Sequence, residues 1–145
     1  MCRCWGRLDF GGHSDLTFNG NTGSLAGGIN VSYGATVDIS DAAFAGNVGV
    51  SGGGMHNGET VSMDGVLIVA SSAVNGGGVV NTDGGVLDMS ATEFVFNTAE
   101  LSGGAWYNVG GLRHVTVDGT VTYVGGGTTS ELYPIRYNPG GTCTP

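Results

Sequence analysis

Four aspartates recur at nearly regular spacing and are the residues best placed for acid–base chemistry. They are Asp38, Asp64, Asp88 and Asp118. Each belongs to a short stretch that alternates apolar and polar residues, so the aspartates share the outward face of predicted strands. Two such carboxylates about 8 Å apart fit the separation found in inverting glycoside hydrolases. Because solvated polar columns explain the same pattern, we expect no catalytic residues and treat these aspartates as candidate outward binding columns.

The histidines lack the spacing of a metal site. His13, His56 and His114 occupy different phases of the sequence pattern described below. Metal-binding histidines usually recur at short fixed spacings, alone or with cysteines. We therefore expect surface or corner histidines, no metal and no cofactor.

The three cysteines lie at the two ends of the chain. Cys2 and Cys4 are separated by one residue, which is shorter than the usual spacing of a zinc half-site, and Cys143 is near the other end. An odd number of cysteines permits a disulfide between Cys143 of one copy and Cys2 or Cys4 of the next. Free thiols remain an equal alternative.

A Gly-Gly pair followed by an apolar residue recurs along the chain and marks the repeat to which these side chains belong. The pairs begin at positions 27, 53, 77 and 103, at intervals of 26, 24 and 26 residues. A large apolar residue lies nine residues before each pair, and an Asn or Ser follows that residue by three. The repeat anchors are Phe18, Asn21, Gly27, Gly28, Phe44, Asn47, Gly53, Gly54, Ile68, Ser71, Gly77, Gly78, Phe94, Asn97, Gly103 and Gly104. Such periodic self-similarity is typical of a solenoid.

The alternating stretches align in the same frame and predict stacked strands. They are Val37-Asp38-Ile39-Ser40, Val61-Ser62-Met63-Asp64, Leu87-Asp88-Met89-Ser90 and Val115-Thr116-Val117-Asp118. When equivalent residues stack at about 4.8 Å, the apolar positions form internal columns and the polar positions form outward columns. In this alignment no two carboxylates are adjacent in a column, which avoids repulsion between like charges. The Asn positions should form a polar ladder at a corner.

These patterns predict an all-β chain folded as a parallel β-helix, or β-solenoid, of about five coils of roughly 24–26 residues each. A β-sandwich also has short alternating strands and is the alternative. The fixed distance between the large apolar residue and the Gly-Gly pair favours the β-helix. We expect residues 1–15 to form an incomplete first coil or N-terminal extension, 16–127 the repeats, and 128–145 a C-terminal tail or cap.

Composition excludes several classes of protein. The chain has 30 glycines but only 3 prolines and no Gly-X-Y period, so it is not collagen. It has no lysine, 4 arginines and a formal net charge of −8, which disfavours nucleic acids and anionic membranes as partners. No stretch approaches the roughly 20 apolar residues of a membrane helix, and we expect no direct membrane insertion.

The phased motifs resemble the repeat of the polymorphic outer membrane protein family. The matches are Phe18-x-x-Asn21 with Gly27-Gly28-Ile29, Phe44-x-x-Asn47 with Gly53-Gly54-Met55, and Phe94-x-x-Asn97 with Gly103-Gly104-Ala105. The third unit departs, because Ile68 and Ser71 replace Phe and Asn. The resemblance covers about residues 16–120. It implies a right-handed parallel β-helix used as an extended surface scaffold, often in adhesion.

We therefore expect a non-enzymatic structural or adhesive module, extracellular or on the cell surface, that is part of a longer protein or a subunit of an assembly. Its expected partners are a protein or a glycan, with self-association through the solenoid ends as a further option. A polysaccharide-active enzyme is the alternative, since many β-helices act on glycans. An ice-binding protein is the second alternative, although Thr120-x-Thr122 is a solitary Thr-x-Thr motif.

Overall fold

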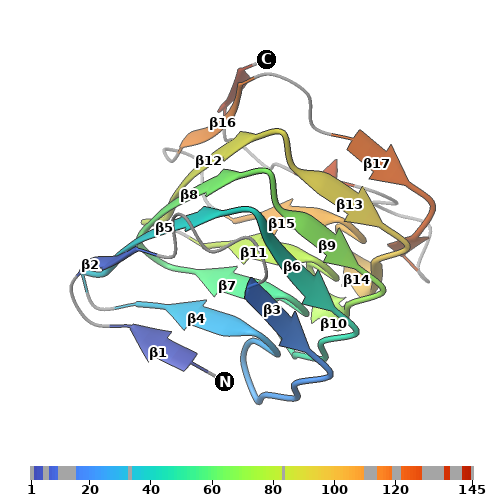
Figure 1. The fold of residues 1–145 in the computed structure, drawn as a ribbon. Helices are drawn as coiled ribbons and strands as arrows, with labels where there is room; N and C mark the ends of the chain where they lie inside the picture. The colour runs from blue at the N-terminus through green and yellow to red at the C-terminus, as the bar shows by residue number, and fades with distance from the viewer. Residues whose placement is uncertain are drawn as a thin grey trace.

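The computed structural model describes residues 2–4, 7–9, 16–32, 34–82, 84–109, 114–118, 122–128, 136–137 and 142–144. Side chains are described for 7–9, 16–32, 34–82, 84–109 and 122–127. Within these ranges all regular structure is β-strand, and the paired strands run parallel. Strands far apart in the sequence stack into one pile of coils that rises from the N-terminus to the C-terminus (Figure 1). The predicted all-β parallel β-helix is confirmed, and the β-sandwich alternative, which requires antiparallel sheets, is wrong.

Four parallel sheets form the walls. Sheet A contains β1 (Cys2–Cys4), β4 (Ile29–Val31), β7 (Met55–Asn57), β11 (Val79–Asn81), β15 (Trp106–Asn108) and β19 (Arg136–Tyr137). Sheet B contains β2 (Arg7–Asp9), β5 (Thr36–Ser40), β8 (Thr60–Asp64), β12 (Val86–Ser90), β16 (His114–Asp118) and β20 (Thr142–Thr144). Sheet C contains β3 (Leu16–Asn19), β6 (Ala42–Ala45), β9 (Leu67–Val69), β13 (Glu93–Val95) and β17 (Thr122–Val124). Sheet D contains β10 (Ser72–Asn75), β14 (Thr98–Ser102) and β18 (Gly127–Thr128).

The ends of the chain contribute strands to the same walls. β1 pairs with β4, and β2 pairs with β5, so the first strands lie beside the first clear repeat. At the other end, β19 pairs with β15 and β20 pairs with β16. Phe10 and His13 lie outside the described residues.

The strands pair in the register that the repeat predicts. In sheet B, Val37 pairs with Val61, Val61 with Leu87, and Leu87 with Val115. In sheet C the anchor column runs through Phe18, Phe44, Ile68, Phe94 and Tyr123. The prediction of stacked columns is therefore confirmed at these positions.

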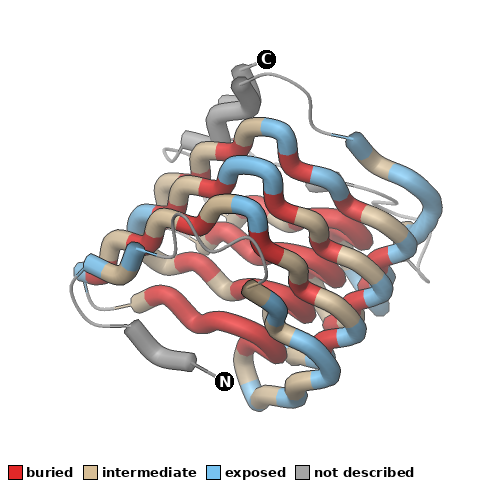
Figure 2. Tube along the Cα trace, in the orientation of Figure 1, coloured by how far each residue is buried: buried red, intermediate tan, exposed pale blue. Residues whose placement is uncertain are grey.

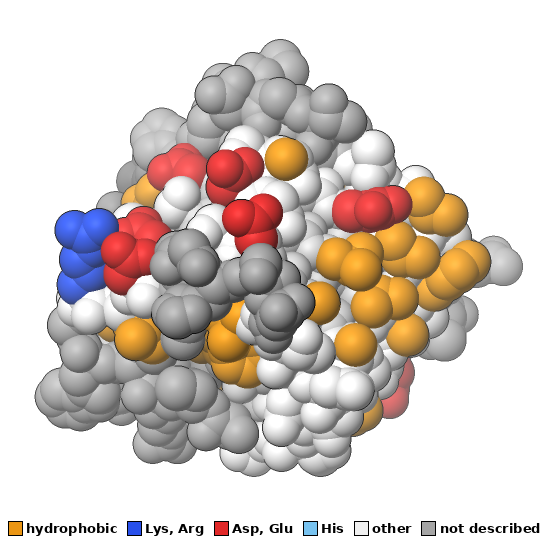
Figure 3. Space-filling model, viewed as in Figure 1, with side chains coloured by type: hydrophobic (Ala, Val, Ile, Leu, Met, Phe, Trp, Pro, Cys, Tyr) orange, Lys and Arg blue, Asp and Glu red, His pale blue; other side chains and the backbone are white. Residues whose placement is uncertain are grey.

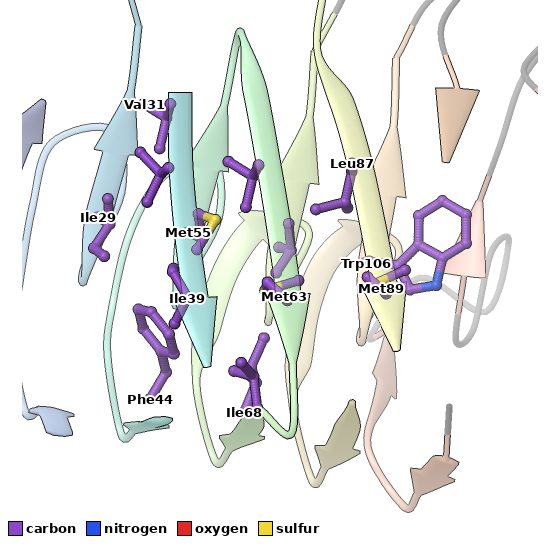
Figure 4. Packing of buried hydrophobic residues seen from close by; sticks show 14 of the residues in the cluster. Ile29, Val31, Ile39, Phe44, Met55, Met63, Ile68, Leu87, Met89 and Trp106 are labelled. Carbon is purple, nitrogen blue, oxygen red and sulfur yellow. The ribbon is translucent and has the colours of Figure 1, made fainter. Parts of the chain in front are cut away.

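Alternation along each strand places one face in the core. β5 and β12 alternate between partly exposed and buried residues, and buried segments follow one another from coil to coil (Figure 2). The inward side chains of sheets A, B and C meet in one apolar core (Figure 4). Each fully buried Val, Leu, Ile, Met or Phe contributes about 1.5–3 kcal/mol relative to an exposed one. Within the anchor column, the Phe18 and Phe44 rings stack at 4.6 Å and the Phe94 and Tyr123 rings at 5.5 Å.

A ladder of polar side chains lines the corner after sheet C. Its members are Asn21, Asn47, Ser71 and Asn97. Asn47 Nδ2 donates to the Phe18 carbonyl at 2.8 Å, and Asn97 Nδ2 donates to the Ile68 carbonyl at 2.7 Å. The Ser71 backbone N–H donates to Asn97 Oδ1 at 2.9 Å. The ladder satisfies corner backbone groups in the neighbouring coils, as predicted.

A second ladder of buried asparagines follows sheet A. Asn57 Nδ2 donates to Asn81 Oδ1 at 2.8 Å, and Asn81 Nδ2 donates to Asn108 Oδ1 at 2.7 Å. All three side chains are completely buried. The repeat alignment does not predict this ladder, because Val31 occupies the position in the first unit and Asn108 comes one residue late. Asn as the third residue after the pairs at Gly53 and Gly77 is the signal that could have found it.

The Gly-Gly pairs lie where the backbones of successive coils approach each other most closely. A Cβ on Gly53 would lie 2.1 Å from the Gly77 carbonyl oxygen, and a Cβ on Gly27 would lie 2.4 Å from that of Gly53. Left-handed backbone belongs instead to the residue before the pair, where Gly52 has φ +86° and Gly76 has φ +58°. Close approach is therefore the reason for the pairs.

The fourth pair is shifted by one residue from the predicted alignment. Val79 pairs with Trp106 and not with Ala105, and Ala105 takes the place that Gly78 has in the coil before. The cause is an irregularity between β10 and β14, which inserts one extra residue before the pair. Gly103 consequently has φ +63°, like Gly52. The apolar residue of this unit that enters the core strand is Trp106, which is buried and donates from Nε1 to Tyr123 Oη at 2.9 Å.

Two glycine variants distinguish the free-energy cost of a left-handed backbone from the cost of steric overlap with the next coil. Gly46 has φ +59° and open space where a Cβ would lie, so Gly46→Ala should lower the free energy of unfolding by about 1–2 kcal/mol. Gly53→Ala should cost at least about 3 kcal/mol or prevent folding, because its Cβ overlaps backbone of the next coil. Urea denaturation measures both. Equal costs for the two variants would contradict the close approach.

Asn81 tests the second ladder. Asn81→Ala should lower the free energy of unfolding by about 3 kcal/mol, because it removes the hydrogen-bond partners of buried Asn57, Asn108 and the Gly85 carbonyl. The exposed Asn19→Ala is the control and should change stability by less than about 0.5 kcal/mol. A loss at Asn81 no larger than that of the control would show that the ladder does not stabilise the stack.

Candidate functional site

The aspartates of sheet B lie on its outward face in two neighbouring columns. One column reads Asp38, Ser62, Asp88 and Thr116, and the other reads Ser40, Asp64, Ser90 and Asp118. Asp38 and Asp88 are half-buried and Asp64 is exposed, while the side chain of Asp118 lies outside the described residues. The sheet thus brings Asp38, Asp64 and Asp88 onto one wall in staggered positions.

The expectation that no two carboxylates are adjacent in one column fails at the N-terminal end of this face. Asp9 pairs directly with Asp38. Arg7 reduces the repulsion between these two carboxylates, because its Nη2 lies 3.2 Å from Asp38 Oδ2 and 3.8 Å from Asp9 Oδ2. Both ion pairs are solvent-exposed and contribute at most about 1 kcal/mol each. The predicted alignment begins at Val37, and so it does not include this first strand.

Asp64 is bound to the next coil by a short hydrogen bond. Ser90 Oγ donates to Asp64 Oδ1 at 2.6 Å. The two residues pair in sheet B, so the bond runs along the column between adjacent strands. A carboxylate that accepts a hydrogen bond while exposed to water remains available to a partner on its other side.

Asp38, Asp64 and Asp88 do not line the hollow that lies beside sheet D. That hollow has a volume of about 260 Å³ and lies on and beside sheet D. It is lined by Val48, Gly49, Ser72, Ala73, Val74, Thr98, Ala99 and Glu100. Among the described side chains, no three His, Cys, Asp or Glu residues come together in a way that could hold a metal ion. The described aspartates of sheet B therefore lie on an outward sheet face, outside this hollow.

His56 occupies the middle of β7 and not a corner, and it is partly exposed between the buried Met55 and Asn57. Its Nδ1 lies 3.0 Å from Asn30 Oδ1, and the two residues pair between β7 and β4. Burial lowers the pKa of His56 below its ordinary value of 6.5, and a hydrogen bond with its own backbone opposes that shift. The neutral imidazole is consequently the favoured form in the folded chain. His114 begins β16, and its side chain lies outside the described residues.

The cysteines lie on different walls at opposite ends of the stack. Cys2 and Cys4 belong to β1 in sheet A, whereas Cys143 belongs to β20 in sheet B. Their side chains lie outside the described residues, so the proposed disulfide between copies stays a prediction.

An apolar outward face on sheet C is the surface feature that the sequence patterns miss. Ala45, Val69, Val95 and Val124 pair in one outward column, and Phe96 follows β13 with 60% of its surface exposed. The available signal is a pair of neighbouring apolar residues in the later anchor strands, such as Ile68-Val69 and Phe94-Val95. One residue of each such pair must face outward in a strand.

Comparison with known proteins adds no relative. No family model, curated protein sequence or solved structure matches the chain. Within the part of the chain that the structure describes, no helix has the length and apolar character needed to cross a membrane.

The depressed pKa of His56 predicts a pH dependence of stability. The unfolded chain takes up a proton at this residue near pH 6.5, whereas the folded chain resists protonation until a lower pH. The stabilising contribution is therefore present above pH 6.5 and is lost as the pH falls through the folded pKa. His56→Gln should flatten the dependence of the free energy of unfolding on pH between about pH 7.5 and 5, as measured by urea denaturation. An unchanged slope would contradict the assignment.

Proposed function

We propose that this chain is a non-enzymatic structural or adhesive β-helix module whose sheet B binds a protein or glycan partner. The observation that carries this proposal is the in-register acidic wall, in which Asp38, Asp64 and Asp88 lie staggered on one outward face. Parallel strands repeat about every 4.8 Å, so this wall presents polar groups at regular intervals. A partner with its own repeat, such as a polysaccharide or an extended peptide, can contact several of these groups together.

The scaffold under this wall supports a binding role. Val37, Val61 and Leu87 behind the aspartates are completely buried, and the two Asn ladders tie successive coils together. A rigid support lets the outward groups bind without a large loss of conformational entropy.

The environment of the carboxylates favours binding over hydrolysis. A glycoside hydrolase needs one carboxyl group that keeps its proton near neutral pH, usually in a water-excluded pocket. Here Asp38 pairs with Arg7, Asp64 accepts from Ser90, and both lie on an open face. A polar column of this kind suits hydrogen bonding to a partner.

The setting of the module is part of the proposal. The resemblance of the repeat to that of polymorphic outer membrane proteins supports a place on the cell surface or outside the cell, in a longer protein or a larger assembly. The surface composition is compatible with that setting, because lysine is absent and the net charge is −8. Such a surface repels other polyanions.

The double variant Asp64→Asn with Asp88→Asn tests the binding face. Its thermal unfolding should match that of the wild type, because both side chains lie on the outward face. Its retention on immobilised neutral, acidic and amino polysaccharides should fall at least about tenfold for each polysaccharide that retains the wild type. The charge-matched control Asp41→Asn with Glu93→Gln should keep wild-type retention.

Product analysis of the same polysaccharides decides between binding and catalysis. The proposal expects no new reducing ends or unsaturated sugars with any variant. Release of such products by the wild type, abolished in the Asp64 and Asp88 double variant, would establish an enzyme instead. Equal retention of the double variant and its control would contradict the binding role of sheet B.

A further inference from the structure

The outward face of sheet C is apolar along most of the stack. Its second outward column reads Asn19, Ala45, Val69, Val95 and Val124, and its first reads Thr17, Ala43, Leu67, Glu93 and Thr122. Figure 3 shows a hydrophobic area, with an acidic side chain at its edge, on the side of the molecule where β9, β13 and β17 lie. A contiguous apolar area on a soluble surface indicates an interaction site.

Phe96 extends this face at considerable conformational cost. It has φ +52°, and the equivalent positions in the other coils are Gly20, Gly46, Ala70 and Gly125. A left-handed backbone at a bulky residue costs about 1–2 kcal/mol. Phe96 is nevertheless 60% exposed, so much of its apolar surface stays unburied in the monomer.

The ring of Phe96 also contacts the next coil. A Cβ on Gly125 would lie 2.4 Å from Phe96 Cδ1 and Cε1, so the ring packs directly over the backbone of the next coil. An exposed aromatic ring beside an apolar column has the character of an interface anchor. Strain maintained at an exposed position points to a function.

The distribution of charge argues for a second copy of this chain as the occupant. Among the described residues, Glu93 is the one acid in the outward columns of sheet C, whereas Asp9, Asp38, Asp64 and Asp88 lie on sheet B. With a net charge of −8 on each chain, two copies repel each other unless they meet at a nearly neutral face. Sheet C is such a face.

We propose that two copies of this chain associate by packing sheet C against sheet C, with Phe96 of each copy against the apolar column of the other. Such an interface is isologous, because the same residues act on both sides. Equal strand spacing lets the outward rows of the two sheets interdigitate, as in the packing of two β-sheets in a sandwich. The interface leaves sheet B outside the contact, so this proposal and the proposed binding role can fail independently.

Sedimentation equilibrium over about 1–100 μM protein tests the proposal in a range where weak dimers dissociate. The experiment includes a thiol reductant, so that disulfides between copies do not contribute. We expect a monomer–dimer equilibrium that tightens when NaCl is raised from about 0.15 to 1 M, because salt screens the repulsion between the chains. Monomer at every concentration and salt level would overturn the proposal.

Phe96→Gly separates association from folding. Glycine relieves the left-handed strain, so the monomer should unfold at the same or a higher temperature, while the dimer dissociation constant should rise at least about tenfold. Val69→Asp places a charge in the middle of the face and should abolish the dimer. The control Val50→Ser alters an apolar side chain that is 52% exposed but lies outside sheet C, and it should leave the dissociation constant unchanged.

Three results would contradict the interface. A Phe96→Gly protein that dimerises as tightly as the wild type would exclude Phe96 as an anchor. Weakening by Val50→Ser equal to that by Phe96→Gly would indicate nonspecific adhesion. Growth beyond the dimer that Val69→Asp does not reduce would indicate head-to-tail association through the solenoid ends.

Discussion

The close stacking of backbone at the corners is the constraint on which the structure depends. The N–H of Gly27 donates to the Gly53 carbonyl at 3.1 Å, and the N–H of Gly54 donates to the Gly78 carbonyl at 2.7 Å. Any side chain at these glycines would push the coils apart and break those bonds. At the corner after sheet A, buried asparagines bond further backbone groups: Asn57 Nδ2 donates to the Val86 carbonyl and Asn81 Nδ2 to the Gly85 carbonyl. Glycine and asparagine thus hold each coil in register with the next.

Most of the fold was predictable from the sequence because that constraint repeats. The distance from the large apolar anchor to the Gly-Gly pair, such as Phe44 to Gly53, recurs once in each coil, and the period-2 pattern assigns the strands of sheet B their inner face. The one-residue shift at Ala105 was not predictable. Gly103 follows Phe94 by nine residues, as in the other units, yet the extra residue in β14 makes Val79 pair with Trp106. The contact of Asp9 with Asp38 also required the structure, since the first coil has different spacing.

The candidate site was predictable only in part. The acidic columns follow from strand alternation, and the structure places Asp38, Asp64 and Asp88 on one wall. The apolar face of sheet C did not follow, because an outward Val69 or Val95 looks like a core residue in a pattern of consecutive apolar residues. Only the register shows which of two neighbours points to solvent. One scaffold therefore carries two different outward walls, an acidic one on sheet B and an apolar one on sheet C, and we assign a separate partner to each.

Amide hydrogen exchange at the Asn side chains, followed by NMR, tests the central claim that buried ladders hold the coils in register. The account predicts that the side-chain amide protons of Asn57 and Asn81 exchange as slowly as backbone amides in sheet B, and that they show nuclear Overhauser effects to each other despite a separation of 24 residues. Rapid exchange of both side chains, or an absence of contacts between them in a folded sample, would contradict it.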